Sequence, residues 1–155
     1  GATLIGDAQG ERFDLLLGLH TDDRWAGDVP KRSGGPFADQ FNAATKYIAT
    51  HRPESLAWGP AKDLGTDILN GVRDLKKTDG PDLLIWGSTS LTTLLLEQGL
   101  VDELVLAVYP LLLGKGKRCF PDTMNAREFA LVSSKGTSTG LLLNTYRHVG
   151  ALKKP

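Results

Sequence analysis

Short apolar runs recur along the chain and are separated by polar segments that contain glycine and proline. Runs of this length, closed by turn residues, predict strands that are covered on both faces of a sheet. In chain order, strands are expected at residues 14–18, 46–50, 55–58, 83–86 and 103–108.

Two segments between these strands have the periodicity of amphipathic helices. Residues 67–78 place their apolar side chains on one side at helical spacing, and either Thr66 or Asp67 can cap the start. A second helix is expected to begin with the hydroxyl residues at 88–90, and Gly99 is suited to terminate it in the left-handed conformation. Its inward face is expected to consist of Leu91, Leu94 and Leu95.

The order of the elements predicts the fold class. Strand, helix, strand, helix and strand follow one another from residue 55 to residue 108, which favours parallel pairing with helical crossovers. Residues 129–134 and 141–148 then predict an antiparallel hairpin with its turn at residues 135–138. We therefore expect an α/β fold with a mixed, mostly parallel sheet between helices and a C-terminal antiparallel hairpin, in a single domain over residues 1–155.

Composition narrows the functional classes. The 155 residues are 41% hydrophobic, enough for a core, and 18 basic residues balance 18 acidic ones. The basic residues are scattered, which disfavours a nucleic-acid partner. The most apolar stretch, residues 104–113, is too short for a membrane helix of about 20 residues. We expect a protein that acts on a small molecule, without a nucleic-acid or membrane partner.

Cysteine and histidine usage adds two expectations. Cys119 is the only cysteine, so an intramolecular disulfide is impossible and a reducing, cytoplasmic location is expected. His20, His51 and His148 lie far apart, without the spacing of a local metal motif, and no metal site is expected.

The turn at residues 87–90 carries the clearest chemical signal. A buried strand ends, Gly87 allows the backbone to turn sharply, and Ser88, Thr89 and Ser90 open a helix. The amide donors and the positive dipole end at a helix start favour a phosphate group. Ordinary helix capping gives the same pattern, and neither GxGxxG nor GxxxxGK[ST] is present. Both interpretations stay open from this turn alone.

A longer pattern begins at the same turn. It consists of Gly87-Ser88, a leucine-rich helix, the run GLVDEL at residues 99–104, and a proline-leucine-glycine segment. The chain thereby resembles the bacterial reductase family that shares the dihydrofolate reductase fold and includes the reductase domain of the riboflavin-biosynthesis bifunctional deaminase-reductase. The resemblance covers about residues 13–149. The proline-leucine-glycine segment contributes Pro110, Leu113, Gly114, Gly116 and Phe120.

The resemblance implies a three-layer α/β/α fold and NADPH as the cofactor, from which hydride is transferred to a small heterocyclic or ribosylamino-pyrimidine substrate. The family's best-known reaction is the reduction of 5-amino-6-(5-phosphoribosylamino)uracil. A homodimer is also implied. Two alternatives remain: a dihydrofolate or pterin reductase, and a family member that binds NADPH without catalysis.

The resemblance also implies which residues meet the cofactor. Those at the glycine-serine turn and the helix that follows would hold the pyrophosphate, and a turn after the first strand would approach the phosphates from the other side. The end of the strand at residues 46–50 would meet the adenosine 2′-phosphate, because an arginine fork pairs phosphate oxygens well. These three sets are Gly87, Ser88, Thr89, Ser90 and Leu91; Gly18, His20 and Thr21; and Thr50, His51 and Arg52.

Two departures from the family pattern bear on this assignment. The family usually has a basic residue after the first Leu-Leu-Gly run, where this chain has Leu19. The family also begins with a strand that residues 1–12 do not resemble, so that strand is expected to be missing. No catalytic residue is assigned, and Asp102 and Glu103 are interpreted as structural because neighbouring strand residues face opposite sides.

Overall fold

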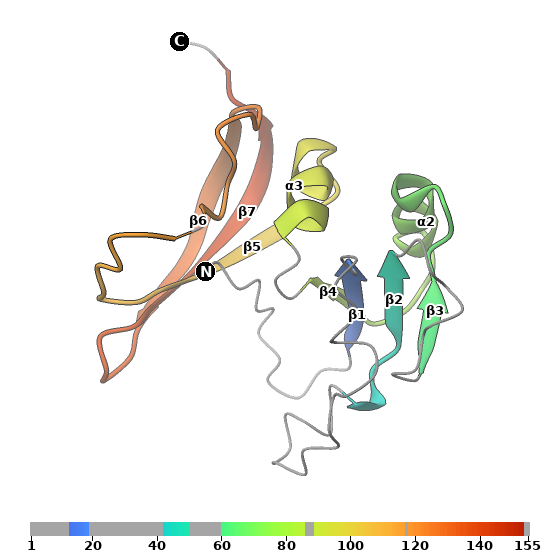
Figure 1. Ribbon diagram of the computed structural model, residues 1–155, viewed down its shortest axis with the longest axis horizontal. Helices are drawn as coiled ribbons and strands as arrows, with labels where there is room; N and C mark the ends of the chain where they lie inside the picture. The colour runs from blue at the N-terminus through green and yellow to red at the C-terminus, as the bar shows by residue number, and fades with distance from the viewer. Residues whose placement is uncertain (1–12, 19–41, 50–59, 86–88, 117, 154–155) are drawn as a thin grey trace. The chain divides into compact units, whose positions relative to one another are not determined.

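The computed structural model describes residues 13–18, 42–49, 60–85, 89–116 and 118–153 of the chain (Figure 1). The chain divides into two compact units. The N-terminal unit is Ala8–Ser88, and the C-terminal unit is Thr89–Pro155 together with Gly1–Asp7. Each unit contains its own hydrogen-bonded sheet.

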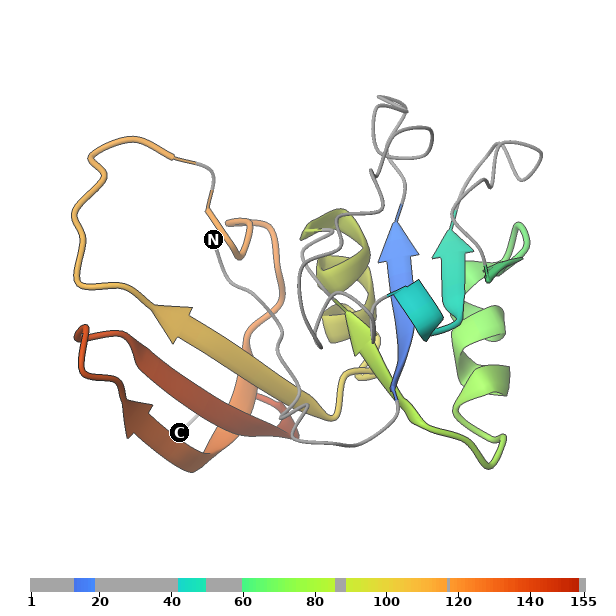
Figure 2. The ribbon, with the colours of Figure 1, turned by 90° about the horizontal axis from the view of Figure 1, so that it is seen from below.

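The sheet of the N-terminal unit has four parallel strands in the order β3-β2-β1-β4 (Figure 2). The strands expected at residues 14–18, 46–50 and 83–86 are confirmed within one or two residues. The strand expected at residues 55–58 lies outside the described residues, and the sequence pattern did not predict β3. The strands are β1 (Phe13–Gly18), β2 (Lys46–Ala49), β3 (Ala61–Asp63) and β4 (Asp82–Ile85).

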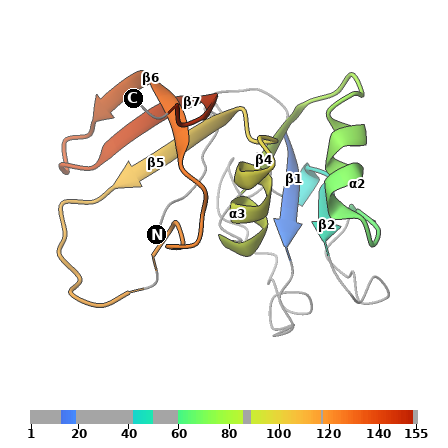
Figure 3. The same ribbon diagram turned by 90° about the horizontal axis from the view of Figure 1, so that it is seen from above.

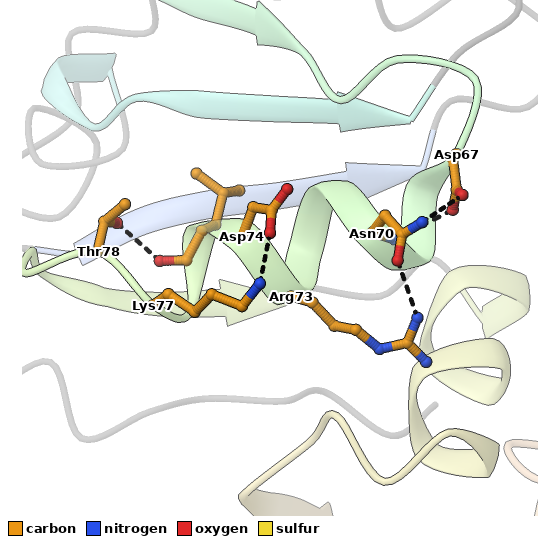
Figure 4. A network of polar contacts seen from close by, with 7 residues as sticks. Asp67, Asn70, Arg73, Asp74, Lys77 and Thr78 are labelled. Atoms are coloured by element: carbon orange, nitrogen blue, oxygen red, sulfur yellow. Dashed lines mark hydrogen bonds and ion pairs between the residues drawn. The ribbon is translucent and has the colours of Figure 1, made fainter.

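Helix α2 (Ile68–Leu75) begins at the second of the two expected caps, Asp67. One carboxylate oxygen of Asp67 accepts a hydrogen bond from the Asn70 amide N at 3.1 Å, and the other accepts from Asn70 Nδ2 at 2.7 Å (Figure 4). The side chain thus satisfies a backbone donor that the helix itself leaves unpaired.

Helix α2 also approaches the chain that follows β3 closely. Val72 is 2% exposed and belongs to the buried core. A Cβ atom added at Gly71 would lie 2.7 Å from the backbone oxygen of Leu64, closer than carbon and oxygen can pack. The absence of a side chain at Gly71 therefore allows the helix to lie against this carbonyl.

The C-terminal unit contains a helix followed by a three-stranded antiparallel sheet in the order β5-β7-β6 (Figure 3). The hairpin predicted from the sequence is confirmed, although its strands are longer and its turn falls at residues 137–141. These elements are α3 (Thr89–Glu97), β5 (Glu103–Val108), β6 (Arg127–Gly136) and β7 (Leu142–Ala151).

The parallel pairing expected for β5 is wrong. This strand pairs antiparallel with β7, from Glu103 opposite Arg147 to Val108 opposite Leu142. β7 is the middle strand of this sheet, and it pairs with the hairpin strand β6 on one side and with β5 on the other. The single mixed sheet expected from the sequence is therefore replaced, among the described strands, by one parallel and one antiparallel sheet.

Helix α3 ends at Gly99, as its sequence predicts. Gly99 has a φ of 65°, its amide donates to the oxygen of Leu96, and the Leu100 amide donates to the oxygen of Leu95. This pair of bonds is the Schellman motif. The guanidinium of Arg127, on β6, donates to the oxygen of Glu97 and so fastens the helix end to the sheet of its own unit.

The core of the described residues is aliphatic. In α3, Leu91 and Leu95 are buried as the helical spacing predicts, whereas Leu94 is only half-buried and Leu96 is buried in its place. The buried apolar residues of β2 and β4 are Ile48, Ala49, Leu84 and Ile85, and those at the start of the C-terminal sheet are Val101 and Leu104.

Lys46, the first residue of β2, is fully buried. Its Nζ donates a hydrogen bond of 2.7 Å to the backbone oxygen of Asn42. Burial lowers the pKa of Lys46 from the ordinary value of 10.5, because transfer from water disfavours the charged amine.

Replacement of Gly99 by alanine is expected to lower the free energy of unfolding by about 1–2 kcal/mol, the cost of holding an L-residue in the left-handed region. The added Cβ would also lie 3.4 Å from His148 Cε1. Urea denaturation measures the loss. Gly116→Ala is the control, since its Cβ would meet nothing within 4 Å. An equal loss in both variants would contradict the role given to the backbone conformation.

Replacement of Lys46 by methionine tests the buried amine. With its pKa lowered on folding, Lys46 binds its proton less tightly in the folded protein than in the unfolded chain. The wild-type protein should therefore gain stability relative to Lys46→Met as the pH rises from the lowered value toward 10.5. Urea denaturation across this range measures the difference, with the exposed Lys115→Met variant as control. A difference that is independent of pH would refute the argument.

Candidate functional site

The four strands of the parallel sheet end at the same edge. Because they are parallel, Gly18, Ala49, Asp63 and Ile85 all close their strands on this side (Figure 2). Gly18 is opposite Ala49 in the register, and Ile85 is opposite Leu16. We call this side the carboxyl edge of the sheet.

The carboxyl edge brings together the strand ends that lead into the predicted cofactor residues. β1 lies between β2 and β4, so the chain leaving Gly18 starts between those leaving Ala49 and Ile85. Of the predicted residues in this unit, Gly18 is described and is the last residue of β1. The others lie outside the described residues: His20, Thr21, Thr50, His51, Arg52, Gly87 and Ser88.

The remaining predicted residues open α3 in the C-terminal unit. Thr89 is the first residue of the helix, and Ser90 is exposed at its first turn. Leu91 is only 4% exposed, so its side chain belongs to the core and only its backbone is suited to a polar ligand. The first turn of α3 has no acidic residue. Its start therefore has the polarity that an anion favours.

The start of α2 differs. The Asp67 carboxylate accepts from the Asn70 amide and places a negative charge at the positive end of the helix dipole. An anion would be repelled there. Of the two helices α2 and α3, only α3 begins in a way that suits a phosphate group.

Two acidic residues at the carboxyl edge were missed by the sequence analysis. Asp63 ends β3 and is exposed, and its Oδ1 accepts a hydrogen bond of 3.0 Å from the Gly65 amide. Asp67 follows four residues later as the cap of α2. A strand placed at residues 61–63 in the sequence analysis would have located both at this edge.

Asp102 and Glu103 make contacts within the C-terminal sheet. The backbone oxygen of Asp102 accepts from the His148 amide at 2.8 Å. Glu103 Oε1 lies 3.7 Å from a terminal nitrogen of Arg147, its partner across the sheet. The interpretation of both residues as structural stays a prediction.

Metal-ligand clusters and membrane-spanning helices are both absent from the described residues. No group of three or more histidine, cysteine, aspartate and glutamate residues in that part of the chain is arranged to hold a metal ion. No helix within it has the length and hydropathy of a bilayer span.

Comparison with known families identifies the chain. Residues 23–143, more than half of the sequence, match the family model described as the RibD C-terminal domain. The chain belongs to the RibD C-terminal domain family. The resemblance drawn from the glycine-serine turn and the segments after it is thereby confirmed.

A relative from Bacillus subtilis strain 168, the uncharacterized protein YyaP, is 29% identical over 140 residues. The match covers 88% of this chain and 74% of YyaP. The name of YyaP states no activity, so this likeness points to no particular reaction.

Solved structures of RibD-related proteins share the fold. A protein named "Putative riboflavin biosynthesis protein" from Shewanella sp. PV-4 superposes with a TM-score of 0.61 at 18% identity, covering 90% of this chain and 75% of that one. RibD of Acinetobacter baumannii superposes with a TM-score of 0.57 at 20% identity, covering 88% of this chain and 47% of RibD. At these identities the likeness establishes a mixed α/β fold of the RibD reductase-like kind, and the chain spans about half of RibD.

Proposed function

We propose that this RibD C-terminal domain protein is an NADPH-dependent reductase of a small heterocyclic or ribosylamino-pyrimidine substrate. One observation carries the proposal: the three segments expected to bind the dinucleotide follow, or begin at, the ends of three adjacent parallel strands. They leave the sheet at Gly18, Ala49 and Ile85. Ligands of α/β proteins bind outside the carboxyl ends of parallel strands.

The strand order also suits an extended cofactor. The ends of β2 and β4 flank β1 and are separated by two strand spacings, about 10 Å. A dinucleotide lying across the carboxyl edge would have its 2′-phosphate near residues 50–52. Its pyrophosphate would then be near residues 87–90, with the Gly18 turn between them. The dihydrofolate reductase-like three-layer arrangement is part of this proposal.

Within each unit, described residues have features that suit such a ligand. In the N-terminal unit, Gly18 presents backbone without a side chain at the end of β1. In the C-terminal unit, the first turn of α3 has the exposed residue Ser90 and no carboxylate. When bound, NADPH supplies a hydride to an electrophilic carbon. The protein's part is to bind the phosphates and to orient the nicotinamide, and we assign no side chain as proton donor.

Two measurements on the full chain test the function. Fluorescence titration should show NADPH binding, and a steady-state assay of NADPH oxidation should show turnover with a ribosylamino-pyrimidine. Turnover with only dihydrofolate or a pterin as the substrate would favour a dihydrofolate or pterin reductase. Tight binding without turnover on either class would favour a non-catalytic NADPH-binding protein. The homodimer and the cytoplasmic location stay predictions.

Substitution of Ser88 by aspartate should weaken NADPH binding severely. A unit negative charge about 4 Å from a doubly charged diphosphate in water corresponds to about a thirtyfold loss of affinity. Fluorescence titration measures the change. Thr123→Asp, which adds the same charge at an exposed position of the C-terminal unit, is the control. Unchanged affinity in Ser88→Asp would remove the turn at residues 87–90 from the site.

Substitution of Arg52 by alanine should weaken NADPH more than NADH. A guanidinium hydrogen-bonded to the 2′-phosphate is worth about ten- to hundredfold in affinity, and NADH lacks that phosphate. The ratio of the two dissociation constants is the readout, and Arg118→Ala removes the same charge from an exposed loop as control. An equal loss for both dinucleotides would reject the 2′-phosphate role of Arg52.

A further inference from the structure

The first turn of α2 contains the dipeptide Asn70-Gly71, whose backbone is chemically labile. The amide nitrogen that follows an asparagine can attack the side-chain carbonyl carbon, Cγ, and close a five-membered ring. Glycine in the second place makes this attack easiest, because it has no Cβ to hinder the approach and has the widest range of backbone conformations. The other asparagines, Asn42, Asn125 and Asn144, are not followed by glycine.

Packing requires the glycine of this pair. A Cβ added at Gly71 would lie 2.7 Å from the Leu64 backbone oxygen, so a larger residue would force α2 away from the chain that follows β3. That displacement would also disturb the buried Val72, the next residue of the helix. The labile dipeptide is therefore retained for its fit, and the conformation around Asn70 controls its chemistry.

Hydrogen bonds engage both reacting groups in the folded helix. The Gly71 amide donates to the backbone oxygen of Asp67 at 2.9 Å, so its hydrogen is directed along the helix. The Asn70 carboxamide lies between two side chains (Figure 4): its Nδ2 donates to Asp67 Oδ2 at 2.7 Å, and its Oδ1 accepts from Arg73 Nη1 at 3.2 Å. Attack therefore requires that this turn first lose its helical hydrogen bonds.

We propose that Asn70 is a site of spontaneous deamidation and that the reaction proceeds when the first turn of α2 opens. The inference goes beyond the proposed function and involves no cofactor. Helix ends open locally at a lower free-energy cost than the core of a protein. Asp67 keeps this turn closed, because its side chain accepts from the Asn70 amide at 3.1 Å and its backbone oxygen accepts from the Gly71 amide. The Asp67 cap therefore sets the rate at which Asn70 is modified.

The reaction consumes one water molecule and releases ammonia. In the open turn a hydroxide ion removes the Gly71 amide proton, and the nitrogen attacks Asn70 Cγ. The N–Cγ bond forms, the Cγ–Nδ2 bond breaks, and Nδ2 leaves as ammonia after taking protons from water. Water then opens the ring. Cleavage of the new N–Cγ bond gives aspartate, and cleavage of the bond from this nitrogen to the backbone carbonyl carbon of residue 70 gives isoaspartate. Either product replaces the donor that faced Asp67 with a carboxylate, so the original cap cannot re-form.

Peptide mapping by mass spectrometry tests the proposal on the full chain, incubated at mildly alkaline pH. It measures the rate at which the Asn70 amide becomes an acid. Asp67→Ala should raise this rate about fivefold, the factor by which loss of a helix cap favours the open turn. Asp67→Ser, which keeps a capping oxygen, should stay near the wild-type rate. In urea that unfolds the protein, all variants should react at one common, faster rate.

Asp74→Ala is the matched control. Asp74 is exposed on the same helix and pairs with Lys77 at 2.8 Å, so its loss should leave the rate at Asn70 unchanged. The proposal is overturned if Asn70 reacts as fast in the folded protein as in urea, or if Asp67→Ala accelerates the reaction no more than Asp74→Ala does. If Asp67→Ala does not fold, the wild type decides: its rate should rise at urea concentrations below the unfolding transition, and a rate independent of urea overturns the proposal.

Discussion

Parallel hydrogen bonding between β1 and its two neighbours is the constraint on which the candidate site depends. Each strand must satisfy its backbone donors and acceptors, and here β1 does so with β2 on one side and β4 on the other. Parallel pairing then forces the three strand ends to the same edge. Strand ends that lie more than 30 residues apart in the sequence are thereby adjacent at one edge of the sheet. Backbone pairing alone brings them together, without a side-chain motif.

The sequence predicted those elements whose own side chains identify them. β1, β2 and β4 are short apolar runs, and α2 and α3 have helical spacing with a recognisable cap or terminator. β3 could not be predicted in this way because Ala61, Lys62 and Asp63 contain one small apolar residue. The strand forms because β2 offers it backbone partners. The backbone amide of Lys46 donates to the Pro60 oxygen, and the backbone amide of Leu64 donates to the Ile48 oxygen. Pairing with a neighbour outweighs local propensity in such a strand.

The pattern of hydrophobic and polar residues also does not determine the direction of a strand. The residues of β5 predicted a strand with the correct bounds, but apolar runs of this kind serve parallel and antiparallel sheets alike. What decides the direction is the partner, and β7 pairs antiparallel with both β5 and β6. In the candidate site the same limit applies: motif and resemblance selected Gly18, the last residue of β1, and residues that follow β1, β2 and β4 in the sequence. Asp63 was missed because its place depends on the unpredicted pairing of β3.

The β3 side of the carboxyl edge disfavours an anion. Asp63 and Asp67 add negative charge there, and the Asp67 cap uses the donor end of α2 for the protein's own carboxylate. In the C-terminal unit, the first turn of α3 carries no acidic residue, so this helix start has the polarity that an anion favours. The chain thus uses one helix start for its own carboxylate and leaves the other without one, and this difference separates a structural cap from a helix start that suits a phosphate group.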